Sequence, residues 1–456
     1  MIPENERANF GSRLGIILAT AGSAVGLGNV WRFPYMAGQN GGAVFILIYI
    51  GCVLLLGIPC MVSEFIIGRR AQANTARAYS LLSGGSSWKW VGYLGVLTGF
   101  LITGYYAVVS GWCLEYIYAS LMGHLRGDAD YVQHYFSQFS QNPWKPVVCM
   151  LLFFCLTHWV IVRGVEKGIE KASKLLMPTL FILLLIIVVA ACTLPGSQRG
   201  IDYLLRPDFS KVSRDVFLGA LGQSFYSLSI AMGCLCTYAS YFSRSTDLTK
   251  SAVQISLIDC LVAILAGLMI FPAAFSVGVS PGSGPSLVFI TLPNVFNQAF
   301  ASVPLLGTVI ALLFYALLSL AALTSLMSLH EVSTAFLHEE LNISRRRGAS
   351  IVTVTCAVIG VFCSLSLGGY SQLQLFGMPL FDLFDFVTGQ VFLPIGGFLT
   401  CLFLGWYVPR NIVREEFFSG QNGRFRSRLF VAYLFSVRYV CPICILLIFL
   451  HQFGVI

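Results

Sequence analysis

The sequence predicts an all-α membrane protein of about 11 transmembrane helices, and three observations lead to this prediction. Of the 456 residues, 57% are hydrophobic and only 11% are charged, whereas soluble domains carry about 25% charged residues. Apolar stretches of about 20 residues, the length that crosses a bilayer as a helix, recur along the whole chain. The basic residues gather in alternate connections between these stretches, as they do in polytopic membrane proteins.

The apolar stretches predict the position of each span. The first carries polar residues and has no small-residue cleavage site, so we expect it to remain in the protein rather than act as a signal peptide. The spans are expected near residues 12–37, 42–68, 90–122, 145–162, 172–193, 214–242, 250–278, 304–338, 349–368, 380–408 and 430–452.

The net charge of +8 does not indicate a nucleic-acid partner, because the basic residues sort by side of the membrane. This asymmetry places the N-terminus in the cytoplasm, and an odd number of spans then places the C-terminus outside. The expected location is the cell (inner or plasma) membrane. The basic connections contain Arg7 and Arg13, then Arg69 to Lys89, Arg163 to Lys174, Arg244 and Lys250, Arg345 to Arg347, and Arg410 to Arg428.

The first span contains residues that a simple membrane anchor would not carry. Gly22, Gly26, Gly28, Asn29 and Arg32 fall at bilayer depth, where each freed amide or buried polar group costs free energy. Gly22 and Gly26 also have the spacing of a small-residue packing face, but packing does not account for the asparagine and arginine. We therefore expect a broken helix whose carbonyl groups bind a cation and whose amides bind an anion.

A second polar window, residues 223–233, lies five spans later. Five spans per half would invert the second half relative to the first, so that two broken helices, the first and the sixth, face one site. The alternative is an ordinary serine-rich helix whose hydroxyls bond to the preceding turn. We expect one transmembrane domain, 1–456, with repeats at about 8–193 and 212–408 and an extra helix at about 429–452.

Further polar groups occur within the spans. Asp259 and Asp385 have apolar neighbours in sequence, and Thr324 and Ser325 are adjacent hydroxyls in the eighth span. Buried carboxylates of this kind usually have a function, although for Glu64 a structural hydrogen bond to an interrupted helix is the better interpretation. No arrangement resembles a catalytic triad, so an enzyme is not expected.

Most of the 14 cysteines are scattered singly in apolar spans, where a thiol behaves as a small hydrophobic group. Cys441 and Cys444 have the spacing of a redox motif, but inside a predicted membrane helix we interpret them as packing residues. The loop at about 123–144 is polar and is expected to lie outside.

Taken together, the motifs resemble the neurotransmitter:sodium symporter family, in particular bacterial transporters of several hydrophobic amino acids. The resemblance extends from Arg7 to the tenth span, and familiar members have 12 spans where this chain has about 11. The motifs are Arg13-Leu-Gly, Gly22-Ser-Ala-Val-Gly-Leu-Gly-Asn29-Val-Trp-Arg32-Phe-Pro34, Asn40-Gly-Gly42, Gly57-Ile-Pro59, Glu64, Tyr105-Tyr106 and Thr237-Tyr-Ala-Ser-Tyr241.

The resemblance implies two sodium sites and a substrate site. The first sodium site would comprise Ala24, Asn29, Ser227, Asp259 and the substrate carboxylate. The second would comprise Gly22, Val25, Ala321, Thr324 and Ser325. The substrate site would comprise Ala24, Leu27, Gly28, Ile102, Tyr106, Tyr226, Ser227, Ser229, Met232, Leu326 and Leu329.

Comparison with the family pattern also suggests what is transported. Biogenic amine carriers have an aspartate at the position of Gly26, so glycine implies a substrate with its own carboxylate. Chloride-dependent relatives have asparagine at the position of Asp259 and serine at that of Ala263, so chloride should be unnecessary here. The apolar lining predicts a large hydrophobic or aromatic side chain.

The resemblance further implies two gates that open alternately. Arg32 would pair with Asp385 outside, and Arg7 with Glu339 at the cytoplasmic end near Tyr241. The motif of Gly168 and Pro178 implies that the fifth helix unwinds to admit water from inside.

The expected function is therefore sodium-driven import of a hydrophobic amino acid, with two Na⁺ as co-transported ions, no other cofactor and no nucleic-acid partner. Whether a proton replaces one sodium ion stays open, because Asp259 can titrate. The alternative is a sensor of the same fold that binds the amino acid without moving it.

Overall fold

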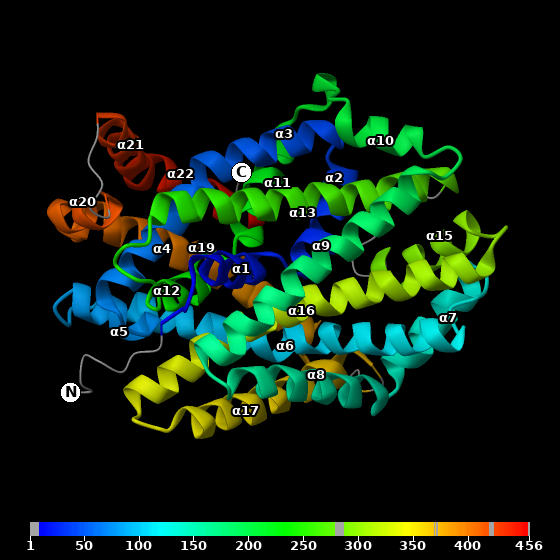
Figure 1. Ribbon diagram of the computed structural model, residues 1–456, viewed down its shortest axis with the longest axis horizontal. Helices are drawn as coiled ribbons and strands as arrows, with labels where there is room; N and C mark the ends of the chain where they lie inside the picture. The colour runs from blue at the N-terminus through cyan, green and yellow to red at the C-terminus, as the bar shows by residue number, and fades with distance from the viewer. Residues whose placement is uncertain (1–8, 279–286, 369, 371–372, 419–423, 455–456) are drawn as a thin grey trace.

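Long helices that cross the molecule along one axis form most of the structure, a computed structural model that describes residues 9–278, 287–368, 370, 373–418 and 424–454. Figure 1 shows α6 (Lys89–Met122), α13 (Leu248–Ser276) and α16 (Pro304–Glu340) running along this axis. These apolar helices are much longer than the roughly 20 residues that a bilayer requires. Their length leaves room for polar ends beyond the hydrocarbon.

The first half of the chain ends with α9. Its helices are α1 (Arg13–Ala24), α2 (Phe33–Gln39), α3 (Ala43–Cys52), α4 (Ile58–Ala71), α5 (Thr75–Leu82), α6, α7 (Ala129–Gln141), α8 (Lys145–Ile161) and α9 (Lys171–Cys192), with π-helical turns at Gly28–Arg32, Val53–Gly57 and Val165–Glu170.

The second half repeats the pattern of one broken helix followed by long ones. Its helices are α10 (Gln198–Leu205), α11 (Arg214–Ser227), α12 (Cys234–Ala239), α13, α15 (Leu292–Ala299), α16, α17 (Arg345–Leu367), α18 (Leu380–Phe386), α19 (Leu393–Leu402), α20 (Arg410–Phe418), α21 (Arg424–Phe435) and α22 (Cys441–Gln452). A 3₁₀ turn covers Phe209–Lys211, π-helical turns cover Leu287–Thr291, Val387–Phe392, Phe403–Tyr407 and Ser436–Val440, and the antiparallel strands β1 (Gln374–Leu375) and β2 (Met378–Pro379) form a hairpin.

The predicted spans match these helices closely. Among the described residues, eight helices are long and apolar enough to cross a membrane, and two more candidates are bent pairs, α1 with the Gly28–Gln39 helix and α7 with α8. The interrupted pair of α11 and α12 accounts for the eleventh predicted span. In this structure the fifth helix is continuous over Val165–Cys192, with a π-helical turn at Val165–Glu170 and Pro178 inside α9, so its unwinding during transport stays a prediction. The loop that we expected outside contains the short helix α7.

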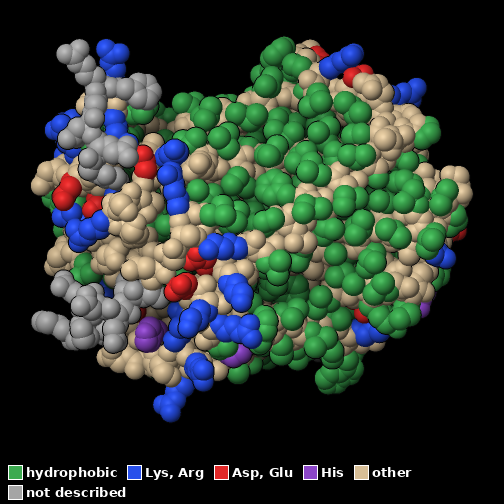
Figure 2. Space-filling view, in the orientation of Figure 1, with side chains coloured by type: hydrophobic (Ala, Val, Ile, Leu, Met, Phe, Trp, Pro, Cys, Tyr) green, Lys and Arg blue, Asp and Glu red, His purple; other side chains and the backbone are tan. Residues whose placement is uncertain are grey.

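The surface separates an apolar band from a basic end. In Figure 2 hydrophobic side chains cover the middle of the molecule, and lysine and arginine side chains crowd one end. Figure 1 places α5, α20 and the start of α17 at that end and α7, α10 and α15 at the opposite end. The basic end therefore collects the connections that the sequence identified as cytoplasmic.

Candidate ion and substrate site between two broken helices

The first break separates α1 from the π-helical turn that begins at Gly28. Val25 has extended backbone angles, and the two parts of the helix meet at 54°. The freed groups find partners from other helices: the Leu27 amide donates to the Tyr106 hydroxyl oxygen at 3.0 Å, and the Ser325 hydroxyl lies 3.2 Å from the Val25 carbonyl oxygen. The sequence prediction of a broken first helix is confirmed.

The second break runs from residue 228 to 233, between α11 and α12. Ser229 and Ala231 have φ values of 55° and 65° there, in the left-handed region that non-glycine residues seldom adopt. The Ala231 amide donates to Glu64 Oε1 at 2.6 Å, and the Ser229 hydroxyl donates to the Ser23 carbonyl at 2.9 Å. Glu64 thus makes the structural hydrogen bond to an interrupted helix that the sequence suggested, and Ser229 joins the two breaks.

Asp259 of α13 lies where the two broken helices meet, with none of its surface exposed. Its carboxylate accepts hydrogen bonds from Asn29 Nδ2 at 2.7 Å, from the Ser227 hydroxyl at 2.9 Å and from the Tyr49 hydroxyl at 3.0 Å. The structure therefore brings together three of the four protein groups predicted for the first sodium site, and Ala24 lines the adjacent cavity. Tyr49, which lies in the same predicted span as Glu64, was not predicted.

The groups predicted for the second sodium site lie where α1 meets α16. Ser325 Oγ is 3.3 Å from the Gly22 carbonyl oxygen, and Thr324 Oγ1 is 3.0 Å from the Ala321 carbonyl oxygen. A β-carbon built on Gly22 would lie 3.1 Å from Thr324 Cβ, so the two helices are in contact at this level. The oxygen-only set of hydroxyls and carbonyls suits a hard cation.

A cavity adjoins both clusters. Polar groups of the broken helices form one side of it, and apolar side chains of α6, α11 and α16 form much of the rest. It is lined by Ser23, Ala24, Gly26, Gly28, Ile102, Tyr106, Tyr226, Ser227, Ser229, Met232, Ser325 and Leu329. Two of the predicted substrate residues, Leu27 and Leu326, are not among the lining residues. The backbone amide of Leu27 is hydrogen-bonded to Tyr106, which does line the cavity, and Leu326 is fully buried. Ser23 was not predicted.

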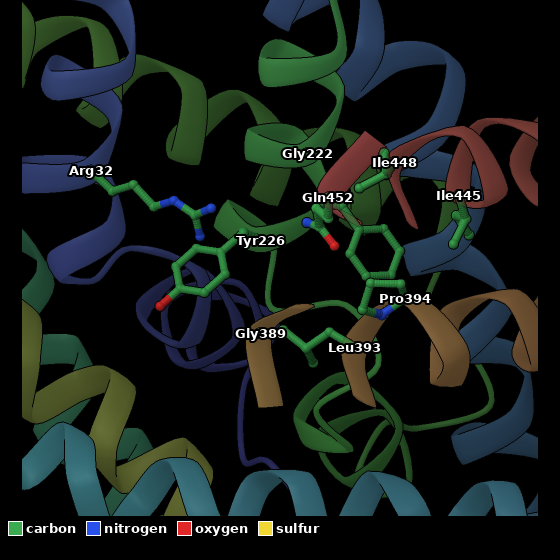
Figure 3. Close-up of a pocket in the computed structure, with 10 residues that line it drawn as sticks. Arg32, Gly222, Tyr226, Gly389, Leu393, Pro394, Ile445, Ile448 and Gln452 are labelled. Carbon is green, nitrogen blue, oxygen red and sulfur yellow. The ribbon is translucent and has the colours of Figure 1, made fainter. Parts of the chain in front are cut away.

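Tyr226 also lines a second, outer cavity (Figure 3), where the Arg32 guanidinium lies 4.2 Å from the centre of its ring. Asp385 instead accepts a hydrogen bond from the Tyr105 hydroxyl at 3.1 Å. The ion pairs among the described residues do not include the predicted pair of Arg32 and Asp385. Gln452 of α22 lines the same outer cavity, a position that nothing in the sequence pointed to.

At the basic end, Glu331 connects two helices. Its Oε1 accepts hydrogen bonds from the Tyr241 hydroxyl at 2.8 Å and from Arg345 Nη1 at 2.9 Å. Glu339 Oε2 accepts a hydrogen bond from the backbone N–H of Asn74 at 2.7 Å. The predicted partner of Glu339, Arg7, lies outside the described residues, so that gate stays a prediction.

Asp247, at the start of α13 and outside the spans, ties that helix to the C-terminal segment. Arg426 donates to both of its carboxylate oxygens at 3.0 Å. Burial alone would raise the pKa of this carboxyl, but the hydrogen bonds from Arg426 and the Lys250 amide outweigh it and hold the pKa below its ordinary value. Asp247 is therefore ionised at neutral pH.

Comparison with known proteins identifies this arrangement. The family model described as the sodium:neurotransmitter symporter family matches residues 7–130 and 131–455. The chain belongs to this family. As a member of it, the chain is a multi-pass membrane transporter and not an enzyme.

Two relatives and one solved structure match nearly the whole chain. An uncharacterized sodium-dependent transporter of Bacillus subtilis, YhdH, is 37% identical, covering 99% of both chains, and one of Haemophilus influenzae is 33% identical, covering 98% of both. The crystal structure of MhsT in complex with L-phenylalanine is similar with a TM-score of 0.87 and 40% identity, covering 98% of this chain and 99% of that one. The fold match confirms the predicted all-α architecture.

Proposed function

We propose that this symporter imports hydrophobic or aromatic L-amino acids together with two sodium ions by alternating access, and that it does not require chloride. The observation that carries the proposal is the position of the buried Asp259 cluster next to an apolar cavity, between two broken helices. A cation bound at Asp259, Asn29 and Ser227 would have the substrate carboxylate as a further ligand. Sodium and substrate would then bind together, which couples their movements.

The polar side of the cavity suits a carboxylate. Tyr106 uses its oxygen to accept the Leu27 amide, which leaves the hydroxyl proton for an anion. A β-carbon on Gly26 would lie only 2.5 Å from Ser325 Oγ and 3.0 Å from the Tyr106 hydroxyl, so this place has no room for an acidic side chain of the protein. A substrate with its own carboxylate complements this geometry.

The apolar side of the cavity favours a hydrophobic side chain. Ile102, Met232 and Leu329 line it together with the Tyr226 ring, and a flexible methionine adapts to side chains of different shape. The bound L-phenylalanine in MhsT, a structure 40% identical in sequence, supports a substrate of this class. Polar and charged amino acids would lose their hydration without gaining partners here.

The ion requirement follows from the fixed charge. Asp259 supplies a negative charge beside the first sodium ion, and a bound chloride would add nothing to the neutralisation. In alternating access, the pair of Arg32 and Asp385 would close the outer gate, and the pair of Arg7 and Glu339 would close the cytoplasmic gate. The N-terminus would lie in the cytoplasm and the C-terminus outside. In this structure the Glu331 network at the basic end is formed, whereas Arg32 stacks on Tyr226.

The test is uptake of labelled L-phenylalanine into proteoliposomes that contain the purified protein. We expect accumulation with an inward sodium gradient, no accumulation when potassium replaces sodium, and no change when gluconate replaces chloride. Uptake that persists in sodium-free acidic buffer would reject coupling to two sodium ions and favour a proton. Binding of phenylalanine without uptake or counterflow would show a sensor instead.

Replacement of Asp259 tests the charge argument. Asp259→Asn should reduce sodium-driven uptake in chloride-free buffer by about tenfold or more, equivalent to about 1.4 kcal/mol, and added chloride should restore part of it. Asp130→Asn, in the first turn of α7 and remote from the cavity, is the matched control. Equal uptake by Asp259→Asn and the control would contradict the assignment of the first sodium site.

A further inference from the structure

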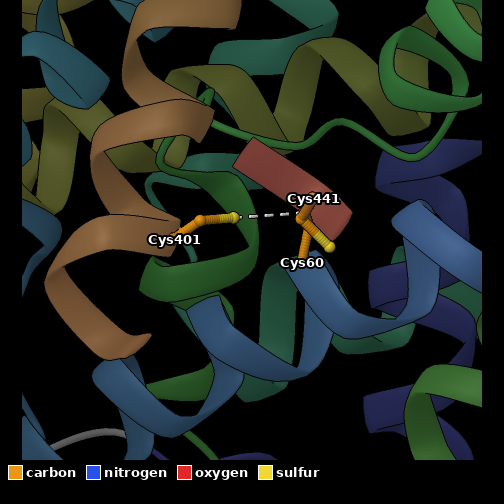
Figure 4. A group of neighbouring side chains, drawn as sticks. All are labelled: Cys60, Cys401 and Cys441. Carbon is orange, nitrogen blue, oxygen red and sulfur yellow. Dashed lines mark hydrogen bonds between the residues drawn. The ribbon is translucent and has the colours of Figure 1, made fainter. Parts of the chain in front are cut away.

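Three cysteines from distant parts of the sequence meet inside the molecule. Cys60 comes from α4, Cys401 from α19 and Cys441 from the start of α22, and their side chains converge (Figure 4). The sulfur atoms of Cys60 and Cys401 are 3.6 Å apart, and all three sulfurs lie within 4.8 Å of one another. Each residue is at most 1% exposed. Cys441 thus faces the thiols of Cys60 and Cys401. Its neighbours in this cluster are therefore distant in sequence, and Cys444, which has redox-motif spacing to Cys441, is not among them.

The three helices deviate from regular geometry at this level. A π-helical turn at Val53–Gly57 ends shortly before Cys60, another at Ser436–Val440 ends immediately before Cys441, and a third at Phe403–Tyr407 begins shortly after Cys401. Such turns are rare and occur often at functional sites. The turns also bring polar atoms to the cluster, since Cys441 Sγ lies 3.5 Å from Ser436 Oγ and 3.8 Å from the Leu55 carbonyl oxygen.

The spacing fits one metal ion held by three sulfurs. With a metal–sulfur distance of about 2.3 Å, three sulfurs around an ion at their centre lie about 4.0 Å from one another. The Cys60–Cys401 separation of 3.6 Å is slightly shorter than this value, and the other two separations do not exceed 4.8 Å, so small side-chain movements suffice to reach it. The donor set contains only sulfur, which selects soft cations over sodium, magnesium and calcium.

From this geometry we infer that Cys60, Cys401 and Cys441 form a binding site for one soft divalent cation, of the class of Cd²⁺ or Zn²⁺. Two thiols lose their protons to the solvent, and the third binds as a neutral thiol, so that the cation, two thiolates and one thiol together carry no net charge. Neutrality matters because an uncompensated charge in a buried site is very costly. The inference does not rest on the proposed transport function.

Occupation of the site would fasten three helices together. Cys60 lies one helical turn before Glu64, whose carboxylate holds the Ala231 amide in the second break. A cation on Cys60 would therefore restrain α4 close to the segment that lines the substrate cavity, and would tie it to α19 and α22. The bound protein should be more resistant to unfolding than the free one.

The test is titration of the purified, reduced, full-length protein with Cd²⁺. We expect the ultraviolet absorption of cadmium–thiolate bonds to saturate at one tightly bound equivalent, with release of two protons and a higher unfolding temperature, and Ca²⁺ should produce none of these effects. Cys60→Ala, Cys401→Ala and Cys441→Ala should each abolish the tight equivalent. Serine is substituted at the same three positions as well, because it nearly preserves the side-chain volume. At each position, the Ala or the Ser variant should remain monodisperse and so be folded well enough for the titration.

Matched controls separate the site from other thiols. Cys444→Ala, one turn along α22, and Cys363→Ala, buried in α17, should keep the tight equivalent. The inference fails if the three variants bind Cd²⁺ as tightly as the controls. It also fails if mass spectrometry of the unreduced protein shows a disulfide between Cys60 and Cys401.

Discussion

At the scale of single residues, Gly26 shows how a missing side chain creates a site. The α-carbon of Gly26 lies so close to Ser325 and Tyr106 that a β-carbon would come within 3.0 Å of each side chain. Both neighbours belong to the cavity lining. Their hydroxyl groups can therefore point toward a ligand only because residue 26 has no side chain.

Gly26→Ala should reduce sodium-driven phenylalanine uptake by about tenfold or more, because the methyl group must displace one of two hydroxyl groups in the site. Gly51→Ala is the matched control: a β-carbon there meets nothing within 4 Å, and alanine favours the helix. Initial uptake rates at equal protein amounts check both variants. Uptake by Gly26→Ala at the rate of the control would contradict the close fit.

Many of the site residues could be predicted from the sequence because polar residues are conspicuous in apolar spans. Asn29 and Asp259 stand out in this way, and the structure joins them. Tyr49 and Ser23 were not predicted as site residues, because a single tyrosine or serine is common in membrane helices and its sequence context does not indicate which group it contacts. The left-handed backbone of Ala231 could not be predicted, because it depends on the carboxylate of Glu64 from another helix.

At the scale of the elements, α4 supports the second broken helix through Glu64. The carboxylate is 2% exposed and accepts the Ala231 amide at 2.6 Å. An amide left without a partner in this position costs about 1–3 kcal/mol. The strained segment between α11 and α12 therefore depends on an acceptor from a different helix.

Glu64→Ala should lower the unfolding temperature of the purified protein more than Glu64→Gln does, because glutamine retains an oxygen acceptor for the Ala231 amide. Glu415→Ala removes an exposed carboxylate that pairs with Arg70 on the surface, and it should have little effect. Thermal unfolding in one detergent compares the three variants. An unchanged unfolding temperature in Glu64→Ala would contradict the supporting role.

The positions of the spans were predictable because apolar length alone determines them, and most predicted ends lie within a few residues of the observed ones. The packing of α22 was not predictable. Its apolar face gives no information about which helices it contacts, yet Gln452 lines the outer cavity and Cys441 meets α4 and α19. Contacts between distant spans depend on side-chain shape, which a hydropathy pattern does not record.

At the scale of the whole molecule, the charge asymmetry is the feature that orients the protein. Lysine and arginine crowd the end that contains α5, α20 and the start of α17 (Figures 1 and 2). Connections rich in these residues remain on the cytoplasmic side of membranes. We therefore expect the basic end to face the cytoplasm and the end with α15 to face outward.

An epitope inserted after Ser302, between α15 and α16, should react with antibody on intact spheroplasts. The same epitope between Gly84 and Gly85, where a side chain would meet open space, should react only after the membrane is made permeable. Immunofluorescence with and without permeabilisation measures both, and retained uptake shows that each insertion is tolerated. The reverse pattern would overturn the assigned orientation.

The π-helical turns affect how this chain can be aligned with its relatives. Each turn, such as Val53–Gly57 or Ser436–Val440, has a wider hydrogen-bonded ring than an α-helical turn and so takes up an additional residue. A relative with a regular α-helix at the same place would be shorter by a single residue in the middle of a span. An alignment that permits gaps only in loops would then pair the wrong residues along the rest of that helix.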